Sequence, residues 1–305
     1  MVTKEALGAD FLSRIGNTPL LRLQRIGLEF PRVTLLVKAE WFNPGGSVKD
    51  RTAANIIAAA EQAGQLNEKR ILLDATSGNT GVAYAMIGST KGYRVKLCVP
   101  SNAGREILQT LRAFGANLVL TSPLEGSDGS VREAQKLAAA EPNLYFYANQ
   151  YNNPANWKAH YQSTGPEIWQ QTQGEVTHFV AGIGTSGTLM GTGRFLKQQN
   201  SSLQVIAVQP DSPLHGLEGL KHMPTSIVPR IYDSHFPDRI LDIKTEEAYQ
   251  QVKRLAAEEG LLVGVSSGAA LAAGLKVAAR IQEGCIVMAF PDGGSRYLDE
   301  EFWKH

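Results

Sequence analysis

Cysteine is scarce in this sequence, since only Cys98 and Cys285 occur among its 305 residues. Each lies inside an apolar run, VKLCVP or GCIVMAF, of the kind that forms a buried strand. A framework of disulfides is therefore excluded, and a reducing cytoplasm is the expected compartment. The six histidines show no H-x-x-x-H spacing and the cysteines no C-x-x-C spacing, so no metal site is predicted.

An excess of charge of one sign is also absent, because 30 lysine and arginine residues stand against 29 acidic ones. This balance excludes the strongly basic surfaces that bind nucleic acids or anionic membranes. No apolar stretch approaches the roughly 18 residues that a membrane-spanning helix needs. The N-terminal sequence lacks the pattern of a secretory signal. We therefore expect neither a nucleic-acid partner nor a membrane partner.

The sequence does contain a regular alternation of short apolar runs and longer helical patterns. Strands are predicted at 34–40, 70–76, 93–100, 117–122, 178–184, 203–210, 239–243 and 285–290. Helices are predicted at 47–63, 79–91, 104–114, 127–140, 186–199, 245–259 and 267–281. This order predicts an α/β fold whose mainly parallel, twisted sheets are covered by helices on both faces. The polar segment QYNNPANW at 150–157 predicts a hinge between two lobes.

The segment NPGGSVKDR at 43–51 places a lysine where a helix is predicted to begin. Ser47 followed by Asp50 predicts a capping box that opens this helix. Lys49 then falls in the first turn, where the helix dipole and burial in a cleft both disfavour the ammonium form. A partly neutral lysine is what Schiff-base chemistry requires. Taken alone, however, the motif also fits a solvated lysine at a helix start.

Two further strand-to-helix turns carry groups that bind anions. In DATSGNTG at 74–81, hydroxyls, an amide and free N–H groups gather at a helix N-terminus, which suits a carboxylate or is simply a well-capped turn. In VAGIGTSGTLMGTGR at 180–194, Gly182, Gly184 and Gly187 match G-x-G-x-x-G. The next strand ends in Gln209 rather than in an acidic ribose ligand, which weakens a dinucleotide interpretation. The turn favours one phosphate monoester over glycines that merely pack a loop.

Together and in this order, the segments IGNTPLLRL, NPGGSVKDR, TSGNTG, GIGTSGT and GVSSGAA resemble the cysteine synthases, or O-acetylserine sulfhydrylases. These enzymes belong to the tryptophan-synthase-β-like class, fold type II, of pyridoxal-phosphate enzymes. The resemblance runs from about Ile15 to Tyr297. AHYQSTGPEIWQQT and GVSSGAA are most similar to the B-type isoform, some of whose members accept thiosulfate.

The resemblance implies two α/β lobes with pyridoxal 5′-phosphate in the cleft between them. A smaller, mobile lobe would span 45–152 and carry TSGNTG, and a larger lobe of 12–44 plus 153–305 would carry the phosphate loop. Lys49 would form the internal aldimine and later remove the Cα proton, Asn79 would bond the ring hydroxyl, and Ser266 would face the pyridine nitrogen. The implied phosphate ligands are Gly184, Thr185, Ser186, Gly187 and Thr188, and the implied ligands of the substrate carboxylate are Thr76, Ser77, Thr80 and Gln150.

A serine at the pyridine nitrogen donates a hydrogen bond but does not keep that nitrogen protonated, so the ring would be a weaker electron sink. Such a ring suits β-elimination better than transamination. The implied reaction is replacement of the β-substituent of O-acetyl-L-serine, or of O-phospho-L-serine, by sulfide or thiosulfate. It would give L-cysteine or S-sulfocysteine through an α-aminoacrylate.

Several alternatives stay open at this level. Lys221 and His222 stand where the A-type isoform is small and apolar, so they form either an anion-selective pair or a solvated loop. The resemblance also implies a homodimer, and serine acetyltransferase is a possible partner. A short cystathionine β-synthase and a serine/threonine dehydratase are alternatives that use the same cofactor. A nucleotide-dependent dehydrogenase and a catalytically idle binding protein are alternatives from other classes.

Overall fold

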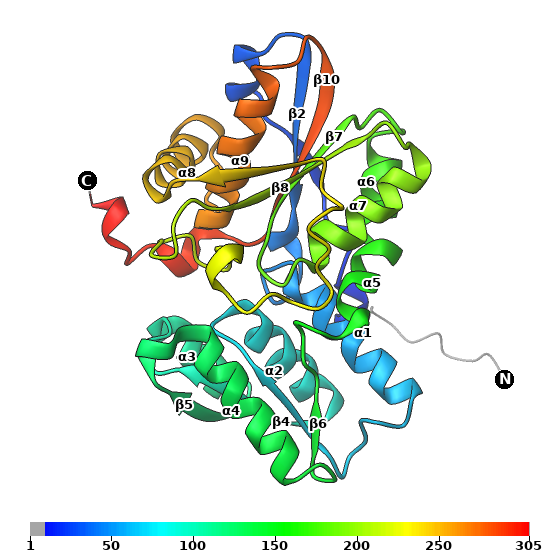
Figure 1. Ribbon diagram of the computed structural model, residues 1–305, viewed down its shortest axis with the longest axis vertical. Helices are drawn as coiled ribbons and strands as arrows, with labels where there is room; N and C mark the ends of the chain where they lie inside the picture. The colour runs from blue at the N-terminus through cyan, green and yellow to red at the C-terminus, as the bar shows by residue number, and fades with distance from the viewer. Residues whose placement is uncertain (1–9, 305) are drawn as a thin grey trace, which may run out of the picture.

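Two separate β-sheets organise the computed structural model, which describes residues 10–304 (Figure 1). The larger sheet has six strands in the order β1-β2-β10-β7-β8-β9, and the smaller has four in the order β5-β4-β3-β6. Every neighbouring pair is parallel except β1 and β2. The predicted α/β fold with mainly parallel sheets is therefore confirmed. Residues 1–9 and residue 305 lie outside the described residues. The prediction that the N-terminus carries no secretory signal falls partly on these residues.

The elements have the following bounds. The strands are β1 (Leu20–Arg22), β2 (Val33–Ala39), β3 (Ile71–Ala75), β4 (Arg94–Pro100), β5 (Asn117–Thr121), β6 (Tyr145–Tyr147), β7 (His178–Gly182), β8 (Gln204–Pro210), β9 (Arg239–Ile243) and β10 (Gly284–Phe290). The helices are α1 (Lys49–Gln62), α2 (Asn79–Lys91), α3 (Arg105–Ala113), α4 (Gly126–Ala140), α5 (Pro154–Gln162), α6 (Thr164–Gln171), α7 (Gly187–Gln199), α8 (Thr245–Glu259) and α9 (Val265–Ala278).

Both faces of the larger sheet are buried. Along β10, Ile286 and Met288 join the core under α8 and α9, whereas Cys285 and Val287 join the core under α6 and α7. Alternate residues therefore reach opposite cores, and the strand needs apolar side chains at nearly every position. This arrangement explains the continuous apolar runs of the sequence.

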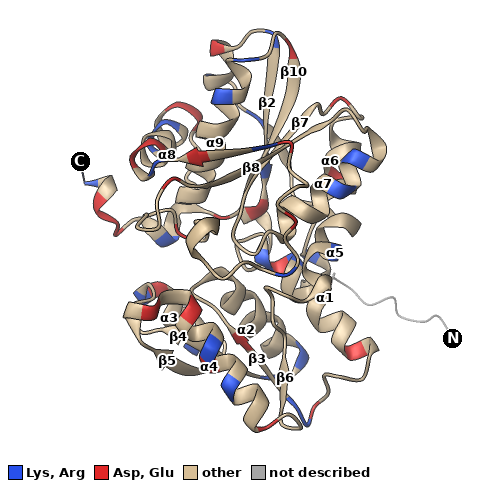
Figure 2. Ribbon diagram, viewed as in Figure 1, with Lys and Arg blue, Asp and Glu red and all other residues tan. Residues whose placement is uncertain are grey.

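The smaller sheet is covered in the same way, and it forms the lower lobe in Figure 1. Helices α1, α2 and α3 pack on one face, where Ile56, Tyr84 and Leu111 share a core with strand residues. Helix α4 packs on the other face, where Val131 meets Cys98. Both cysteines are free and buried, and burial raises the pKa of Cys98 to about 12. Acidic and basic residues are scattered over both lobes rather than segregated (Figure 2).

Four elements were not predicted, namely β1, β6, α5 and α6. The segment 150–157 was predicted to be a hinge, but its second half is the first turn of α5. Asn153 caps this helix, because its side chain accepts a hydrogen bond from the N–H of Ala155 at 3.0 Å, and Pro154 occupies the first position. Residues 154–157 are therefore helical, and the hinge between the lobes stays a prediction. The bounds of the two lobes stay a prediction.

None of the helices between residues 10 and 304 combines the length and the apolarity that crossing a lipid bilayer requires.

Candidate active site

The predicted site segments converge because each follows the carboxyl end of a parallel strand. Lys49 lies downstream of β2, the TSGNTG turn follows β3, and the glycine-rich loop follows β7. The carboxyl ends of β2 and β7 meet at one edge of the larger sheet, where α/β proteins bind their ligands. Strand β3 belongs to the smaller sheet, and its turn is joined to that edge by the contact of Asn79 with Asp292. A fourth segment, the turn at 291–294 after β10, joins them, since the N–H of Val48 donates to the carbonyl of Pro291 at 2.8 Å.

Lys49 is the first residue of α1 and is half-buried. Its amine forms neither a hydrogen bond nor an ion pair with any residue from 10 to 304. Burial lowers the pKa of Lys49, and the nearby carboxylates of Asp292 and Glu40 oppose this effect only in part. The amine thus has no partner among the described residues, and its lowered pKa favours the neutral form that a nucleophile or a base requires.

The predicted capping box is wrong in its second half. The hydroxyl of Ser47 accepts from the N–H of Lys49 at 3.3 Å, but Asp50 turns away from Ser47 and accepts from the N–H of Gly45 at 2.5 Å. A Cβ at Gly45 would lie 2.4 Å from the Asp50 carboxylate, so only glycine fits there. Burial raises the pKa of Asp50 to about 7. The interaction anchors the turn that precedes Lys49.

The TSGNTG turn is held together by its own hydroxyls. The Thr76 hydroxyl accepts from the N–H groups of Gly78 and Gly81, at 3.1 and 3.0 Å. Thr80 donates to the side-chain oxygen of Gln150 at 2.8 Å, and Gln150 donates to a backbone carbonyl. The N–H groups of Ser77, Asn79 and Thr80 find no acceptor in the described part of the chain. The turn therefore presents free donors to an anion.

Asp292 and Arg296, which sequence reasoning missed, meet Asn79 across the boundary between the lobes. The Asn79 amide donates to Asp292 at 2.7 Å and accepts from Arg296. Asp292 also accepts from the Tyr297 hydroxyl at 2.6 Å, and its backbone carbonyl accepts from Gly264, two residues before Ser266. Ser266 is buried, and its hydroxyl has no partner among residues 10–304. These contacts join Asn79 and the segment that leads to Ser266 to one residue, Asp292, whose charge also acts on Lys49.

The glycine-rich loop at 184–188 forms a nest of free donors. Ser186 adopts a left-handed conformation with φ 70°, which is strained for a residue other than glycine. Its hydroxyl is buried without any partner. A Cβ at Gly184 would lie 2.2 Å from the carbonyl oxygen of Gly219, and one at Gly187 would lie 1.9 Å from Asn156. Strain, an orphaned hydroxyl and obligatory glycines are typical of a loop built for a phosphate.

Asn156 and His160 connect this loop to α1. The Asn156 amide donates to Thr185 at 3.0 Å and accepts from Thr52 at 3.1 Å. His160 is buried, and its ring lies within hydrogen-bonding distance of Thr52, Thr164 and Thr188. Both residues lie on α5, an element absent from the predicted secondary structure, so sequence reasoning offered no signal for them. They fix the loop relative to the helix that carries Lys49.

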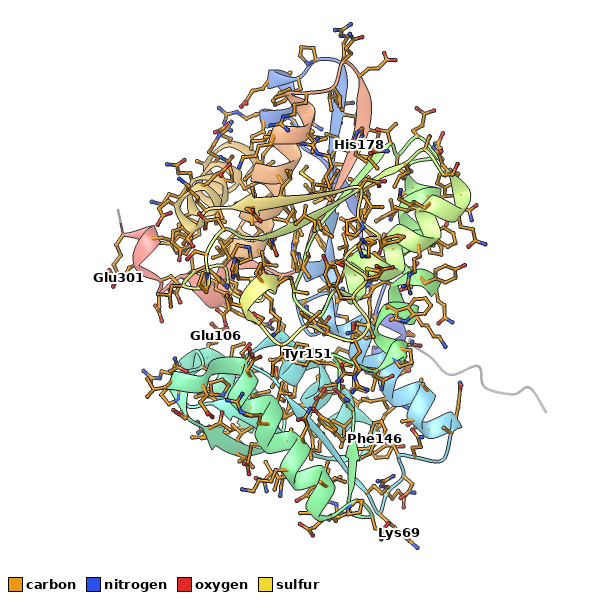
Figure 3. The ribbon with its side chains drawn as sticks, in the orientation of Figure 1. Lys69, Glu106, Phe146, Tyr151, His178 and Glu301 are labelled. Carbon is orange, nitrogen blue, oxygen red and sulfur yellow. The ribbon has the colours of Figure 1, made fainter. Side chains whose placement is uncertain are left out.

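Lys221 and His222 do not form a free basic pair. The Lys221 ammonium donates to Asp128 of α4 at 3.0 Å, lies over the Tyr151 ring and is only 8% exposed. Figure 3 labels Tyr151 at the boundary between the two lobes. The His222 ring bonds the Thr225 hydroxyl at 2.8 Å. Lys221 therefore links the two lobes, and its role in anion selection stays a prediction.

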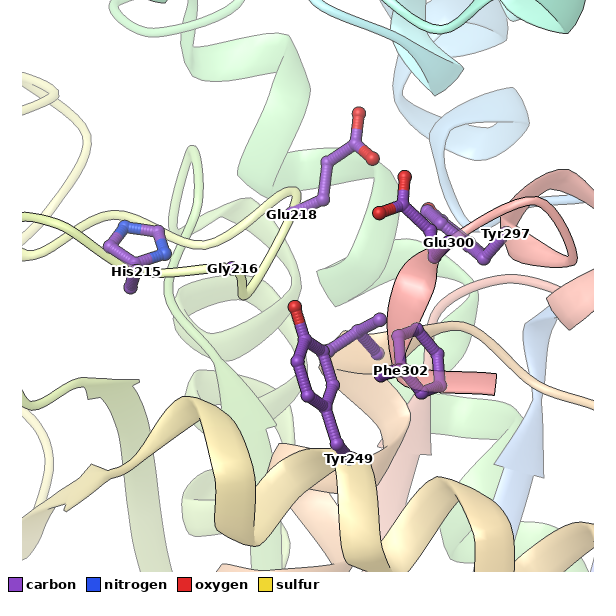
Figure 4. Close-up of a pocket in the computed structure, with 8 residues that line it drawn as sticks. His215, Gly216, Glu218, Tyr249, Tyr297, Glu300 and Phe302 are labelled. Carbon is purple, nitrogen blue, oxygen red and sulfur yellow. The ribbon is translucent and has the colours of Figure 1, made fainter. Parts of the chain in front are cut away.

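A pocket of about 260 Å³ lies beside the loop that leads to Lys221, because His215, Gly216 and Glu218 line it (Figure 4). Glu218 and Glu300 face each other across it, and Tyr249 and Tyr297 line its walls. Burial and the neighbouring carboxylates of Asp292 and Glu300 raise the pKa of Glu218 to about 7. A Cβ on Gly78 would lie 3.9 Å from the Glu218 carboxylate, so Glu218 lies near the TSGNTG turn. Its lining is acidic.

Comparison with known proteins identifies the class of this site. The family model described as pyridoxal-phosphate dependent enzyme matches residues 12–292, and the chain belongs to that family. It is 50% identical to a cysteine synthase of Aquifex aeolicus over 293 residues, 94% of this chain and 90% of the relative. It is 44% identical to cysteine synthase B of Pseudomonas aeruginosa over 284 residues, 93% of this chain and 94% of the relative. The crystal structure of cysteine synthase from Entamoeba histolytica superposes with a TM-score of 0.92 at 37% identity, covering 100% of this chain and 93% of that one.

These comparisons confirm the resemblance to cysteine synthases and the pyridoxal-phosphate cofactor. The family match also excludes the alternative that this protein is a nucleotide-dependent dehydrogenase. The observed site fits the cofactor, because it offers an unpaired buried amine at Lys49 and a nest at 184–188 with an orphaned Ser186 hydroxyl. The loop sequence at 184–188, GTSGT, contains no lysine or arginine, so backbone donors would hold the phosphate. The role of each residue stays a prediction.

The nest itself can be tested with Gly184→Ala. The added methyl group meets a backbone oxygen at 2.2 Å, so the loop must move, and cofactor binding must move it back. Overpacking of this kind costs about 1–3 kcal/mol. We expect the Kd of pyridoxal phosphate to rise about tenfold or more, measured by titrating cofactor-free protein. Gly27→Ala is the control, because a Cβ there meets nothing within 4 Å. An unchanged Kd in Gly184→Ala would remove the loop from the phosphate site.

His160 predicts a pH-dependent stability. Burial, helped by the charge of Arg51, lowers the pKa of His160 to about 3 from an ordinary value of 6.5. Below pH 6.5 the unfolded chain takes up a proton that the folded chain does not, so this contribution to stability is lost as pH falls. Between pH 6.5 and 5 the free energy of unfolding should fall by roughly 2 kcal/mol more in the wild type than in His160→Gln. Urea denaturation measures this, with His235→Gln in an exposed loop as control. Parallel pH profiles of wild type and His160→Gln would contradict the assignment.

Proposed function

We propose that this protein makes L-cysteine by replacing the acetate group of O-acetyl-L-serine with sulfide. The observation that carries the proposal is the Lys49 amine, which has no hydrogen-bond or ion-pair partner among residues 10–304 and whose pKa is lowered by burial. Its segment is linked to two sets of free N–H donors: through Arg296 to the TSGNTG turn, and through Thr52 and Asn156 to the loop at 184–188. An amine of this kind between two anion sites suits a cofactor phosphate on one side and a substrate carboxylate on the other.

Pyridoxal phosphate, when bound, supplies an aldehyde that joins an amine and a ring that withdraws electrons from the substrate Cα. Lys49 would take the proton from Cα, acetate would leave from Cβ, and sulfide would form the new C–S bond. Lys49 would then return the proton to Cα. Asn79 would bond the ring oxygen, and Ser266 would lie at the pyridine nitrogen. Lys49 is thus both the covalent anchor and the proton carrier.

The substrate carboxylate would be bound by the TSGNTG turn, through its N–H groups and through Ser77. Thr80 already bonds Gln150, and Thr76 bonds the N–H groups of Gly78 and Gly81, so these residues would shape the turn as well as contact the substrate. The lobe of residues 45–152 would close on the substrate and keep water from the reacting carbon. The ion pair of Lys221 with Asp128 crosses the same boundary and supports a closed arrangement.

The charges around the site favour neutral over anionic substrates. Glu218 and Glu300 line the adjacent pocket, and the charge of Glu300, with the ionised fraction of Glu218 near its pKa of about 7, would disfavour a phosphate ester or thiosulfate. Lys221 is paired with Asp128 and almost fully buried, so its charge is already balanced. O-Acetyl-L-serine and sulfide are therefore preferred to O-phospho-L-serine and thiosulfate.

A matrix of substrates and nucleophiles tests this proposal. The purified protein is given O-acetylserine or O-phosphoserine with sulfide or thiosulfate, and serine with homocysteine, and the products are identified. The highest kcat/KM is expected for O-acetylserine with sulfide. A faster reaction of serine with homocysteine would instead support a short cystathionine β-synthase, and keto-acid formation a dehydratase. In Lys221→Ala, an equal loss for acetylated and phosphorylated serine would reject Lys221 as an anion receptor.

The assembly and location of the protein remain proposals as well. We propose that it acts on small molecules as a homodimer in a reducing cytoplasm. Its two buried free cysteines are compatible with that compartment. Gel filtration with light scattering tests the dimer, and co-purification with serine acetyltransferase tests that partner.

A further inference from the structure

The Asn79 amide is held at both ends by partners of fixed hydrogen-bonding character. Its oxygen accepts from the Arg296 guanidinium, and its nitrogen donates to the Asp292 carboxylate at 2.7 Å. A guanidinium carries donors only, so it bonds an oxygen and never an amide NH₂ group. A carboxylate accepts in turn from the nitrogen. The two ends of the amide are therefore not interchangeable, although an asparagine side chain is nearly symmetric in shape.

Arg296 and Asp292 are themselves anchored. The second amino group of Arg296 donates to the carbonyl of Gly45 at 2.6 Å, in the turn that precedes Lys49. Asp292 is 2% exposed and accepts from Tyr297 at 2.6 Å. A Cβ on Gly264 would lie 2.1 Å from its second oxygen, so the carboxylate packs directly on that backbone. Both partners belong to the segment after β10, whereas Asn79 begins α2 of the other lobe.

This arrangement decides what Asn79 offers a ligand. Its oxygen already accepts from the Arg296 cation, and one of its two N–H groups is occupied by Asp292. The nitrogen end, which is turned away from Arg296, keeps a free N–H donor. A donor next to a ring hydroxyl stabilises the ionised oxygen, whereas a carbonyl in that place would favour the protonated hydroxyl.

We propose that Arg296 is a positioning residue that, with Asp292, turns Asn79 so that it presents an N–H group to the cofactor's ring oxygen. The inference rests on the proposed placement of Asn79 beside that ring. Arg296 itself touches neither cofactor nor substrate in this proposal and acts only through the amide. The ionised ring oxygen belongs to the form of bound pyridoxal phosphate that absorbs visible light, so the orientation has a spectroscopic signature.

Arg296→Met removes the donors and keeps a long side chain. We expect the visible absorption band of the bound cofactor to weaken in favour of its near-ultraviolet band, and the Kd of pyridoxal phosphate to rise about tenfold. Arg296→Lys should restore part of both, because lysine also only donates. Arg254→Met, which removes a guanidinium from the outer surface of α8, should leave both unchanged. Absorbance spectra and cofactor titration measure these effects without any turnover.

Asn79→Ala separates the inference from the placement on which it rests. Asn79→Ala alone should shift the same band, and Arg296→Met should add little in that background. If Asn79→Ala leaves the spectrum unchanged, both the placement and the inference fail. If Asn79→Ala shifts it but Arg296→Met does not, or if Arg296→Met has its full effect without Asn79, only the inference is overturned. Should Arg296→Met not fold, Arg296→Gln serves instead, because glutamine both donates and accepts and no longer fixes the amide.

Discussion

Lys49→Ala is expected to yield a protein that folds normally but is colourless after desalting and does not make cysteine. The amine has no hydrogen-bond or ion-pair partner within residues 10–304, so its removal breaks no hydrogen bond or ion pair there. The same removal takes away the group that, in the proposed function, anchors the cofactor covalently and moves the Cα proton. Proton transfer alone contributes about 10²–10⁴-fold to rate, so kcat should fall by at least that factor.

Three measurements check this expectation together. Borohydride treatment should fix pyridoxal phosphate to a peptide that contains Lys49 in the wild type and to none in the variant. The urea midpoint of the cofactor-free protein should stay unchanged. Lys276→Ala is the control. It removes the ion pair of Lys276 on α9 with Glu247 on α8, and it should keep colour and activity. A variant that remains yellow through a covalent bond, or that keeps wild-type turnover, would disprove the assignment of Lys49.

Long-range contacts explain most of what the sequence could not show about the site. Lys221 was predicted as a free cation because its partner, Asp128, lies 93 residues earlier in the chain. Asp50 was predicted to cap its own helix, but it bonds the preceding turn at Gly45 instead. The spacing of neighbouring residues predicts well where a helix starts. It says little about which distant residue will be the hydrogen-bonding partner of a polar side chain.

The elements that were predicted correctly are those with a strong local signal. Strands such as β4 and β10 are seven apolar-rich residues long, and the helix at α2 starts after a glycine turn. In contrast, β1 and β6 have only three residues each, which is too short for any periodicity. Helix α5 is polar because it packs between α1 and α7 through Asn156 and His160 rather than on a sheet. Because these contacts use polar residues, the apolar pattern by which a helix is predicted is missing from α5.

The turn after β10 could have been suspected. It follows a buried strand and contains Asp292 between Pro291 and two glycines, much as the other site turns follow strands. What the sequence does not contain is the link from this turn to Asn79, more than two hundred residues earlier. That link depends on how the two sheets are arranged relative to each other, which local sequence patterns do not predict.

A second large effect is expected in stability. Arg51 lies two residues after Lys49 and is 2% exposed at its side chain. It bonds both oxygens of Glu40 and both of Glu167, at 2.6 to 2.9 Å, and Glu167 also pairs with Lys38 at 2.7 Å. The cluster fixes α1, and with it Lys49, to the end of β2 and to α6.

Arg51→Met should lower the free energy of unfolding by about 3–5 kcal/mol, because it leaves the fully buried carboxylate of Glu40 without its main counter-charge. Burial pushes the pKa of Glu40 upward, and Arg51 together with Lys38 and Thr18 more than offsets this effect, so the pKa rises once Arg51 is gone. A carboxyl with a raised native pKa loses stability as pH increases through that value. The destabilisation should therefore be larger at pH 8 than at pH 5.

Lys91→Met, which breaks an exposed pair with Glu61, should cost less than about 1 kcal/mol at either pH. In Glu40→Gln the further replacement of Arg51 should cost much less than it does alone, since no buried charge is then stranded. Additive losses with no pH dependence would show that Arg51 contributes by packing and not by its charge.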